Sequence, residues 1–211
     1  MSVHIPEKIL VGRIRSGTPS VNSFWSGGSY DGAPLSYLAT FEINSVSAGY
    51  PGYYNNTNLY NAYDIQVDSC DDCKYCHTKK GCVKRDDMDI IYELLYSANT
   101  LVISSPVYFG GMTDKTMKII NRFQRFFEQK YSLKDNNIPR FNNLFIISTQ
   151  GGVNPKMFNG VYQTYKILEL LFNPDYSSIL TVPSTDEFHP LDQQKVLKKI
   201  QKIQKKMITF Q

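Results

Sequence analysis

The residues best suited to chemistry are concentrated in one cysteine-rich segment. The four cysteines of the chain are separated by gaps of two, two and five residues: Cys70, Cys73, Cys76 and Cys82. Short gaps let successive thiolates turn toward one centre, and the longer gap, which contains Gly81, lets the chain wrap back to supply a fourth ligand. Structural disulfides normally lie far apart and close long loops. The cluster therefore predicts a metal centre.

Four thiolates suit either a [4Fe-4S] cluster or a tetrahedral zinc ion. Zinc sites more often pair two ligand couples across a longer spacer, so the short consecutive gaps favour iron and sulfide, with zinc as the alternative. The segment 73–77 also satisfies the C-x-x-C-H pattern of haem attachment, and two cysteines could form a redox pair, but both interpretations leave two thiols without a role. Nearby bases would offset the negative charge of a thiolate-bound cluster: Lys74, Lys79, Lys80, Lys84 and Arg85.

Three loops that follow predicted strands carry groups suited to a bound cofactor. The first resembles a phosphate-binding loop because it is dense in hydroxyl and amide donors: Ser16, Thr18, Ser20, Asn22 and Ser23. No Lys or Arg occurs from 16 to 73, so backbone and side-chain dipoles, with Arg13 or Arg15 at the edge, would hold the phosphate.

The other two loops are rich in glycine. The segment Pro106, Val107, Tyr108, Phe109 and Gly110 combines aromatic rings with a flexible backbone, and Thr149, Gln150, Gly151 and Gly152 repeat this design after the next strand. Free backbone amides beside flat rings can hold a planar heterocycle. Two such loops at neighbouring strand ends favour a flavin.

Short apolar strands alternate with helical patterns around these loops. Strands are predicted over 8–14, 100–104, 144–148 and 178–182, and helices over 86–98, 113–129, 157–172 and 191–210. This alternation predicts an α/β fold, a doubly wound five-stranded parallel sheet with helices on both faces, of which these ranges locate four strands. The ligand crevice of such a sheet lies at the carboxyl ends of its strands.

The chain reads as a single domain over 1–211, with 42% hydrophobic and 13% aromatic residues. The segment 24–62 interrupts the alternation and is either a long surface loop or a lid over a ligand.

The formal charge of +4 comes from lysines in the terminal helix, so nucleic acid is not an expected partner. No apolar run approaches the ~18 residues of a membrane span, and no signal core follows the N-terminus, so we expect a cytoplasmic protein. The terminal helix has one apolar stripe: Val196, Ile200, Ile203, Met207 and Phe210.

The cysteine segment 70–88, the segment 105–110 and the segment 118–122 together resemble the iron-sulfur flavoprotein branch of the flavodoxin-like NAD(P)H-dependent FMN reductases. The resemblance implies a flavodoxin-like fold, a [4Fe-4S] cluster on the four cysteines, and a homodimer or homotetramer in which one subunit's cluster approaches another's flavin. It also implies that the hydroxyl-rich loop 16–23 holds the FMN phosphate and that 106–110 and 149–152 hold the isoalloxazine. Two features depart from the family: residues 24–34 intervene before the first helix, and Asn121 replaces an aspartate.

These features predict an FMN-dependent oxidoreductase that converts between one-electron carriers and two-electron flavin chemistry. Its expected partners are a ferredoxin-like carrier or NAD(P)H and a small-molecule or peptide substrate. No acid or base stands out, so no catalytic side chain is assigned. One alternative is a cluster-free NAD(P)H-dependent FMN or quinone reductase with zinc or free thiols at the cysteines. Another is a flavodoxin-like electron carrier without enzymatic activity.

Overall fold

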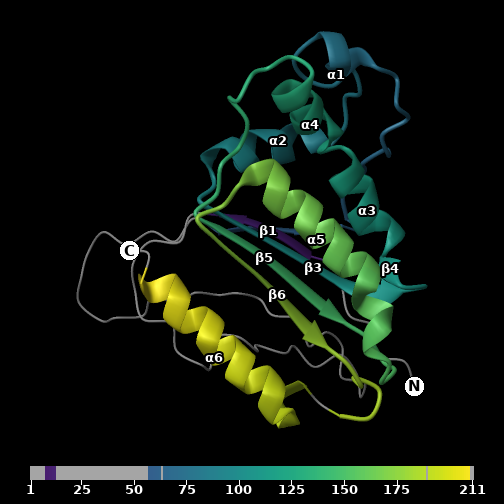
Figure 1. Cartoon of the computed structure of the whole chain (residues 1–211). Helices are drawn as coiled ribbons and strands as arrows, with labels where there is room; N and C mark the ends of the chain where they lie inside the picture. The colour runs from purple at the N-terminus through teal and green to yellow at the C-terminus, as the bar shows by residue number, and fades with distance from the viewer. Residues whose placement is uncertain (1–7, 13–56, 63, 189, 210–211) are drawn as a thin grey trace.

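A mixed sheet with helices on both faces forms the centre of the molecule (Figure 1). The computed structural model describes residues 8–12, 57–62, 64–188 and 190–209. The strand order is β2-β1-β3-β5-β6, and the short β4 pairs with β3 alone. The strands are β1 (Lys8–Gly12), β2 (Thr57–Asn61), β3 (Thr100–Tyr108), β4 (Gly111–Met112), β5 (Asn143–Thr149) and β6 (Tyr176–Val182).

The α/β class is confirmed, but the prediction of five parallel strands is not. Strands β3, β5 and β6 are parallel, whereas β1 runs antiparallel to both β2 and β3. An apolar run predicts that a segment joins a sheet but not its direction, because parallel and antiparallel ladders both satisfy the backbone. The strand order matches the flavodoxin-like arrangement, and the reversed β1 departs from it.

The reversal of β1 changes which end of the sheet its final residue reaches. Gly12 pairs with Thr100, the first residue of β3, so β1 ends at the opposite end of the strands from Tyr108 and Thr149. The expectation that three loops meet at one end of the sheet assumed a parallel β1. The predicted phosphate loop 16–23 and most of the segment 24–62 lie outside the described residues.

The helices are α1 (Tyr75–Thr78), α2 (Met88–Ser97), α3 (Asp114–Asn121), α4 (Gln124–Tyr131), α5 (Asn159–Phe172) and α6 (Gln194–Thr209). The helix predicted over 113–129 is two helices, because the chain tightens at Arg122 and Phe123. Their amides donate to the carbonyls of Ile119 and Ile120, three residues back, as in a 3-10 turn. Both side chains are buried by this turn.

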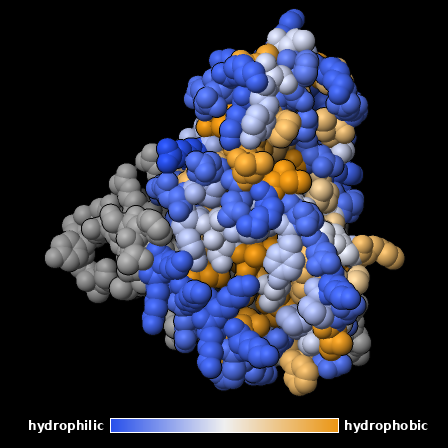
Figure 2. All heavy atoms as spheres, viewed as in Figure 1, coloured by the Kyte–Doolittle hydropathy of each residue, from blue (hydrophilic) through white to orange (hydrophobic). Residues whose placement is uncertain are grey.

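Alternate residues of the central strands pack into two different layers. Leu101 and Ile103 of β3 belong to the main core beneath α2 and α5, whereas Phe145 and Ile147 of β5 face α6. The predicted apolar stripe of α6 is confirmed for Val196, Ile200 and Ile203, which are buried. Figure 2 shows mainly hydrophilic residues over the outer side of this helix. None of the described helices is both long and apolar enough to cross a membrane.

Candidate functional site

The four cysteines line one pocket on the loop between β2 and α2. Three residues of this loop have a left-handed backbone: Asp72 with a φ of 56°, Lys74 with a φ of 61° and Gly81 with a φ of 98°. Such residues turn the chain sharply, and only glycine does so without a steric cost. Two of them flank Cys73 and the third precedes Cys82, so the backbone turns sharply beside two of the four cysteines.

A hydrogen bond and an ion pair hold this loop against α4 and the residues after it. His77 Nδ1 lies 3.0 Å from Glu128 Oε2, and Lys80 Nζ lies 2.6 Å from Asp135 Oδ2. These contacts join α1 and the residues just after it to α4 and to the segment that follows α4. Because exposed pairs contribute little stability, their main effect is to orient the loop.

The bases that the sequence offered as counter-charges have other partners. Lys74 pairs with Asp72, Lys84 with Asp71 and Arg85 with Asp89, while Lys79 lies over the ring of Tyr75. The predicted charge balance depended on counting residues near the cysteines, and local acids already neutralise these side chains. Their role in offsetting the charge of a cluster stays a prediction.

Arg122, to which the sequence pattern gave no role, lines the cysteine pocket from the break between α3 and α4. Its side chain is 1% exposed. Nη1 donates to Asp86 Oδ2 at 2.6 Å and to the carbonyl of Asp68 at 3.0 Å. Nε and Nη2 are buried and have no hydrogen-bond partner among the described residues. A signal was present, since Arg122 falls in an apolar stripe between Ile119 and Phe126.

The Arg122–Asp86 pair shifts the protonation of both groups. Burial alone would lower the pKa of Arg122, but its hydrogen bond to Asp86 and nearby negative groups raise it overall. Burial alone would raise the pKa of Asp86, but bonds from Arg122 and from the amides of Asp68 and Met88 lower it overall. Both groups are therefore charged at neutral pH.

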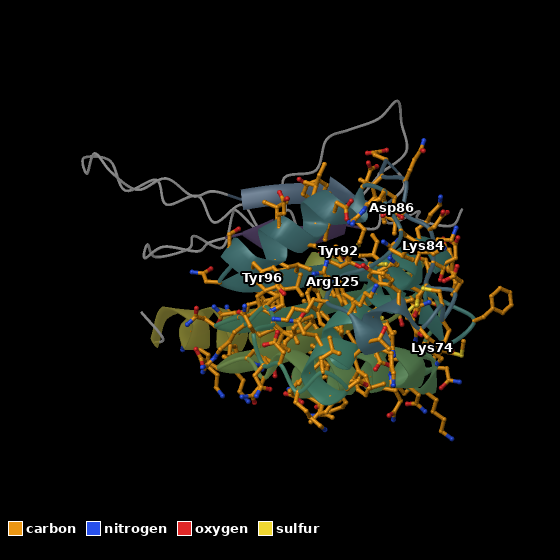
Figure 3. The ribbon with its side chains drawn as sticks, turned by 90° about the horizontal axis from the view of Figure 1, so that it is seen from above. Lys74, Lys84, Asp86, Tyr92, Tyr96 and Arg125 are labelled. Carbon is orange, nitrogen blue, oxygen red and sulfur yellow. The ribbon has the colours of Figure 1, made fainter. Side chains whose placement is uncertain are left out.

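Arg125 lines the same pocket from α4. Its guanidinium carbon lies 4.1 Å from the centroid of the Tyr92 ring, and Figure 3 shows the two side chains beside each other. Its Nε atom is also buried without a partner in the described part of the chain. Two arginines with unused N–H donors therefore line the cysteine pocket.

The residues of the pocket are chemically suited to bind a metal centre, but the cysteine side chains are not grouped around one point. All four thiols are free. Within the described residues, no group of three or more His, Cys, Asp or Glu side chains is placed to hold a metal ion. Burial and the nearby Glu128 and Cys70 raise the pKa of the Cys76 thiol, and a metal would have to displace its proton. The donor set and the unused N–H groups of Arg122 fit a negatively charged centre, and the cysteine side chains must converge to form one.

The predicted aromatic loop 106–110 continues β3 into a hairpin with β4. Val107 pairs with Met112 and Tyr108 with Gly111, which leaves a two-residue turn. Phe109 and Gly110 have φ angles of 51° and 81°, as a type I′ turn requires. The ring of Phe109 is fully exposed, so the hairpin presents an aromatic surface beyond the sheet.

The second predicted flavin loop lies beside the hairpin, because Thr149 pairs in register with Pro106. Two polar side-chain atoms at the end of β5, Thr149 Oγ1 and Gln150 Oε1, are buried with no partner among the described residues, as is Ser104 Oγ in the middle of β3. Unpaired buried polar atoms are rare, and they are typical of sites that bind a ligand or water. The carboxyl ends of β3 and β5 thus fit a hydrogen-bonding cofactor, while the assignment of individual residues to flavin stays a prediction.

The backbone of α5 lies in close contact with the turn of the β3–β4 hairpin. A Cβ atom on Gly160, in the first turn of α5, would lie 2.3 Å from the carbonyl oxygen of Gly110. Only glycine allows α5 to approach the turn this closely. The first turn of α5 therefore determines how close the hairpin turn lies to this helix.

An apolar groove of about 420 Å³ opens beside the cysteine loop, between the α3–α4 segment and α5. Cys70 and Asp72 contribute to its lining, and Phe127 and Ile167, which also line it, are exposed. Figure 2 shows hydrophobic residues gathered over this part of the surface. Neither the cysteine spacing nor the strand-end loops predicted this groove.

Comparison with known proteins places the chain beside iron-sulfur flavoproteins. No family model matches it. It is 38% identical over 58 residues to an iron-sulfur flavoprotein of Methanocaldococcus jannaschii, covering 27% of this chain and 29% of that protein. It is 32% identical over 66 residues to one from Archaeoglobus fulgidus, covering 31% and 34%, and 30% identical over 70 residues to one from Methanosarcina thermophila, covering 33% and 37%. The matches span about a third of the length of these relatives.

Among solved structures, an FMN-dependent NADH-azoreductase from Bacillus anthracis in complex with FMN matches 71% of this chain and 80% of its own. The TM-score is 0.49 and the sequence identity is 17%. The similarity in sequence to iron-sulfur flavoproteins agrees with the resemblance carried by the cysteine segment.

Proposed function

We propose that the chain is an FMN-dependent oxidoreductase with a [4Fe-4S] cluster on Cys70, Cys73, Cys76 and Cys82. The observation that carries the proposal is the single pocket that contains all four cysteines and the unused N–H groups of the buried Arg122. The names of the relatives support the same pair of groups. The protein would convert between a one-electron carrier and two-electron flavin chemistry.

The two strand-end loops would hold the flavin. Bound FMN supplies a group that takes up electrons in pairs and releases them singly. The buried Thr149 Oγ1 and Gln150 Oε1 would meet the polar edge of the ring system, and the hairpin with Tyr108 and Phe109 would cover an apolar face. The hydroxyl-rich segment 16–23 follows β1 along the chain, and β1 ends at the other end of the sheet from these two loops, so its assignment to the phosphate stays a prediction. These groups bind and orient, and no side chain is proposed to transfer a proton.

The expected partners are a ferredoxin-like carrier or NAD(P)H, a small-molecule or peptide substrate, and further copies of the chain. The exposed Phe127 and Ile167, which line the apolar groove, favour a covered surface and thus a homodimer or homotetramer. Cysteines stay reduced, and so able to bind a metal, in a reducing compartment, and we therefore propose a cytoplasmic location.

A second candidate is a cluster-free NAD(P)H-dependent FMN or quinone reductase with zinc or free thiols. It is favoured by the separation of potential metal ligands in the described residues. A flavodoxin-like electron carrier would keep the flavin without a dedicated substrate.

Anaerobic purification followed by a visible spectrum and assays of iron, sulfide, zinc and FMN tests the proposal. We expect bound FMN together with iron and sulfide in equal amounts. Flavin with zinc and no sulfide would establish the second candidate. Absence of flavin would contradict every function proposed above.

A further inference from the structure

The buried guanidinium of Arg122 has more donors than its protein partners use. Arginine carries five N–H groups, and the two on Nη1 are used by Asp86 and Asp68. Nε and Nη2 carry the remaining three and are buried without a partner among the described residues. Burying N–H donors without acceptors costs free energy. The unpaired Nε and Nη2 groups of Arg122 therefore point to a bound ligand that accepts their hydrogen bonds.

The position of Arg122 identifies where that ligand would lie. Arg122 lines the pocket that holds the four cysteines. The pocket also contains Arg125, whose Nε is unused as well. A metal centre bound by four thiolates is negatively charged, and its sulfur atoms accept hydrogen bonds.

The other cations of the loop do not compete for this role. Lys74, Lys80 and Arg85 are exposed and paired with acids. Their charges are screened by solvent and already balanced. Arg122 differs because it is buried and because its charge is paired through Nη1 alone.

We infer that Arg122 is the positioning residue that donates Nε and Nη2 hydrogen bonds to the sulfur atoms of the thiolate-bound cluster and raises its reduction potential. This inference rests on the proposed function. Reduction adds one electron without making or breaking a bond, and it makes the cluster more negative. A buried cation with directed N–H groups stabilises that reduced form more than the oxidised form.

A redox titration of the whole protein with dithionite, followed by electron paramagnetic resonance of the reduced cluster, tests the inference. Arg122→Lys keeps the charge and can keep the pair with Asp86 but loses the forked donors. The double variant Asp86→Asn/Arg122→Gln removes the whole pair without leaving an unpaired charge, and Asp86→Asn is its reference. Arg85→Gln is the matched control, since it removes one exposed cation from the same loop.

We expect the equilibrium constant for reduction to fall at least tenfold in Arg122→Lys relative to the wild type, which is 59 mV for a one-electron couple. The same fall is expected in the double variant relative to Asp86→Asn. Arg85→Gln should change it less than about threefold, as expected for a solvent-screened charge. The FMN content should stay unchanged throughout.

Unchanged potentials in both Arg122 variants would overturn the inference and leave the proposed cluster intact. Absence of iron and sulfide from the wild type would overturn the proposed cluster and the inference together. If the double variant loses its cluster, Arg122→Lys decides alone. Loss of the cluster from Arg122→Lys as well, in a folded protein that retains FMN, would assign Arg122 to the shape of the loop and overturn a role in tuning.

Discussion

The Nη1 atom of Arg122 lies 2.6 Å from the Oδ2 atom of Asp86, and this pair closes the cysteine loop at its base. Asp86 also accepts hydrogen bonds from the backbone amides of Asp68 and Met88. Asp68 precedes the first cysteine and Asp86 follows the last. One carboxylate therefore joins both ends of the loop to the start of α2 and to the break between α3 and α4.

Removal of the Asp86 carboxylate should destabilise the fold strongly. Asp86→Ala leaves the buried Arg122 charge without its partner, and breaking one side of such a pair costs about 3–5 kcal/mol. Urea unfolding measures this loss. Asp89→Ala, which removes an exposed partner of Arg85, should change stability by less than about 0.5 kcal/mol. Equal effects of the two substitutions would contradict the structural role of the Arg122–Asp86 pair.

Acid should weaken the folded state through the same carboxyl. The pKa of Asp86 is lower in the folded state than its usual value of 3.8. As the pH falls, the unfolded state binds the proton first, so this stabilisation is present above about pH 4 and is lost as the pH falls through the folded pKa. Unfolding measured from about pH 6 to about pH 3 should show a shallower loss in Asp86→Asn than in the wild type. Identical slopes would show that Asp86 is not linked to acid unfolding.

Substitution of one cysteine should separate the two cofactors. Cys76→Ser removes a thiolate from the cysteine pocket but touches neither strand-end loop, so we expect loss of the broad iron-sulfur absorbance with FMN still bound. Thr78→Ala, on the exposed side of α1, is the matched control and should retain both groups. Loss of both groups in Cys76→Ser would instead mean that the loop is needed for folding.

An alanine at Gly160 should disturb the hairpin above it. Alanine normally favours a helix over glycine by about 1 kcal/mol. Here the added Cβ would lie 2.3 Å from the Gly110 carbonyl oxygen, and such overpacking costs about 1–3 kcal/mol. We therefore expect a lower unfolding free energy and weaker FMN binding. Gly111→Ala, which has no atom within 4 Å of the new Cβ, is the control. A stabilised Gly160→Ala protein would exclude the close contact.

The tip of the hairpin should show opposite effects on stability and on binding. Phe109 adopts a φ of 51°, which costs a non-glycine residue about 1–2 kcal/mol, and asparagine tolerates this conformation better. Phe109→Asn should therefore raise the unfolding free energy by up to about 1 kcal/mol. It should also weaken FMN binding, measured by fluorescence titration, because the aromatic surface is lost. Val153→Asn, another exposed apolar residue nearby, should change neither quantity. Unchanged flavin affinity in Phe109→Asn would show that the ring of Phe109 does not contact FMN.

Much of the local structure follows from patterns visible along the chain. The apolar spacing of α2, α5 and α6 and the buried runs of β5 and β6 predicted these elements closely, because burial of one face requires a regular period. Strand β3 was predicted to end at residue 104, but it continues to Tyr108 and pairs there with β4. The break at Arg122 was missed, since a 3-10 turn keeps nearly the same spacing as a helix. The direction of β1 was wrong because its apolar residues satisfy either kind of ladder.

The sequence alone determined the donor set of four closely spaced thiols, the two glycine loops and the α/β class, because each depends on residue types at short separations. The tertiary structure decided which groups face those features. It paired most of the loop's basic side chains with local acids and brought Arg122 from 40 residues after Cys82 to the wall of the cysteine pocket. It also set Pro106 opposite Thr149. Such contacts depend on how helices and strands pack. Packing brings together residues far apart along the chain, and their spacing in the sequence does not reveal which of them will meet.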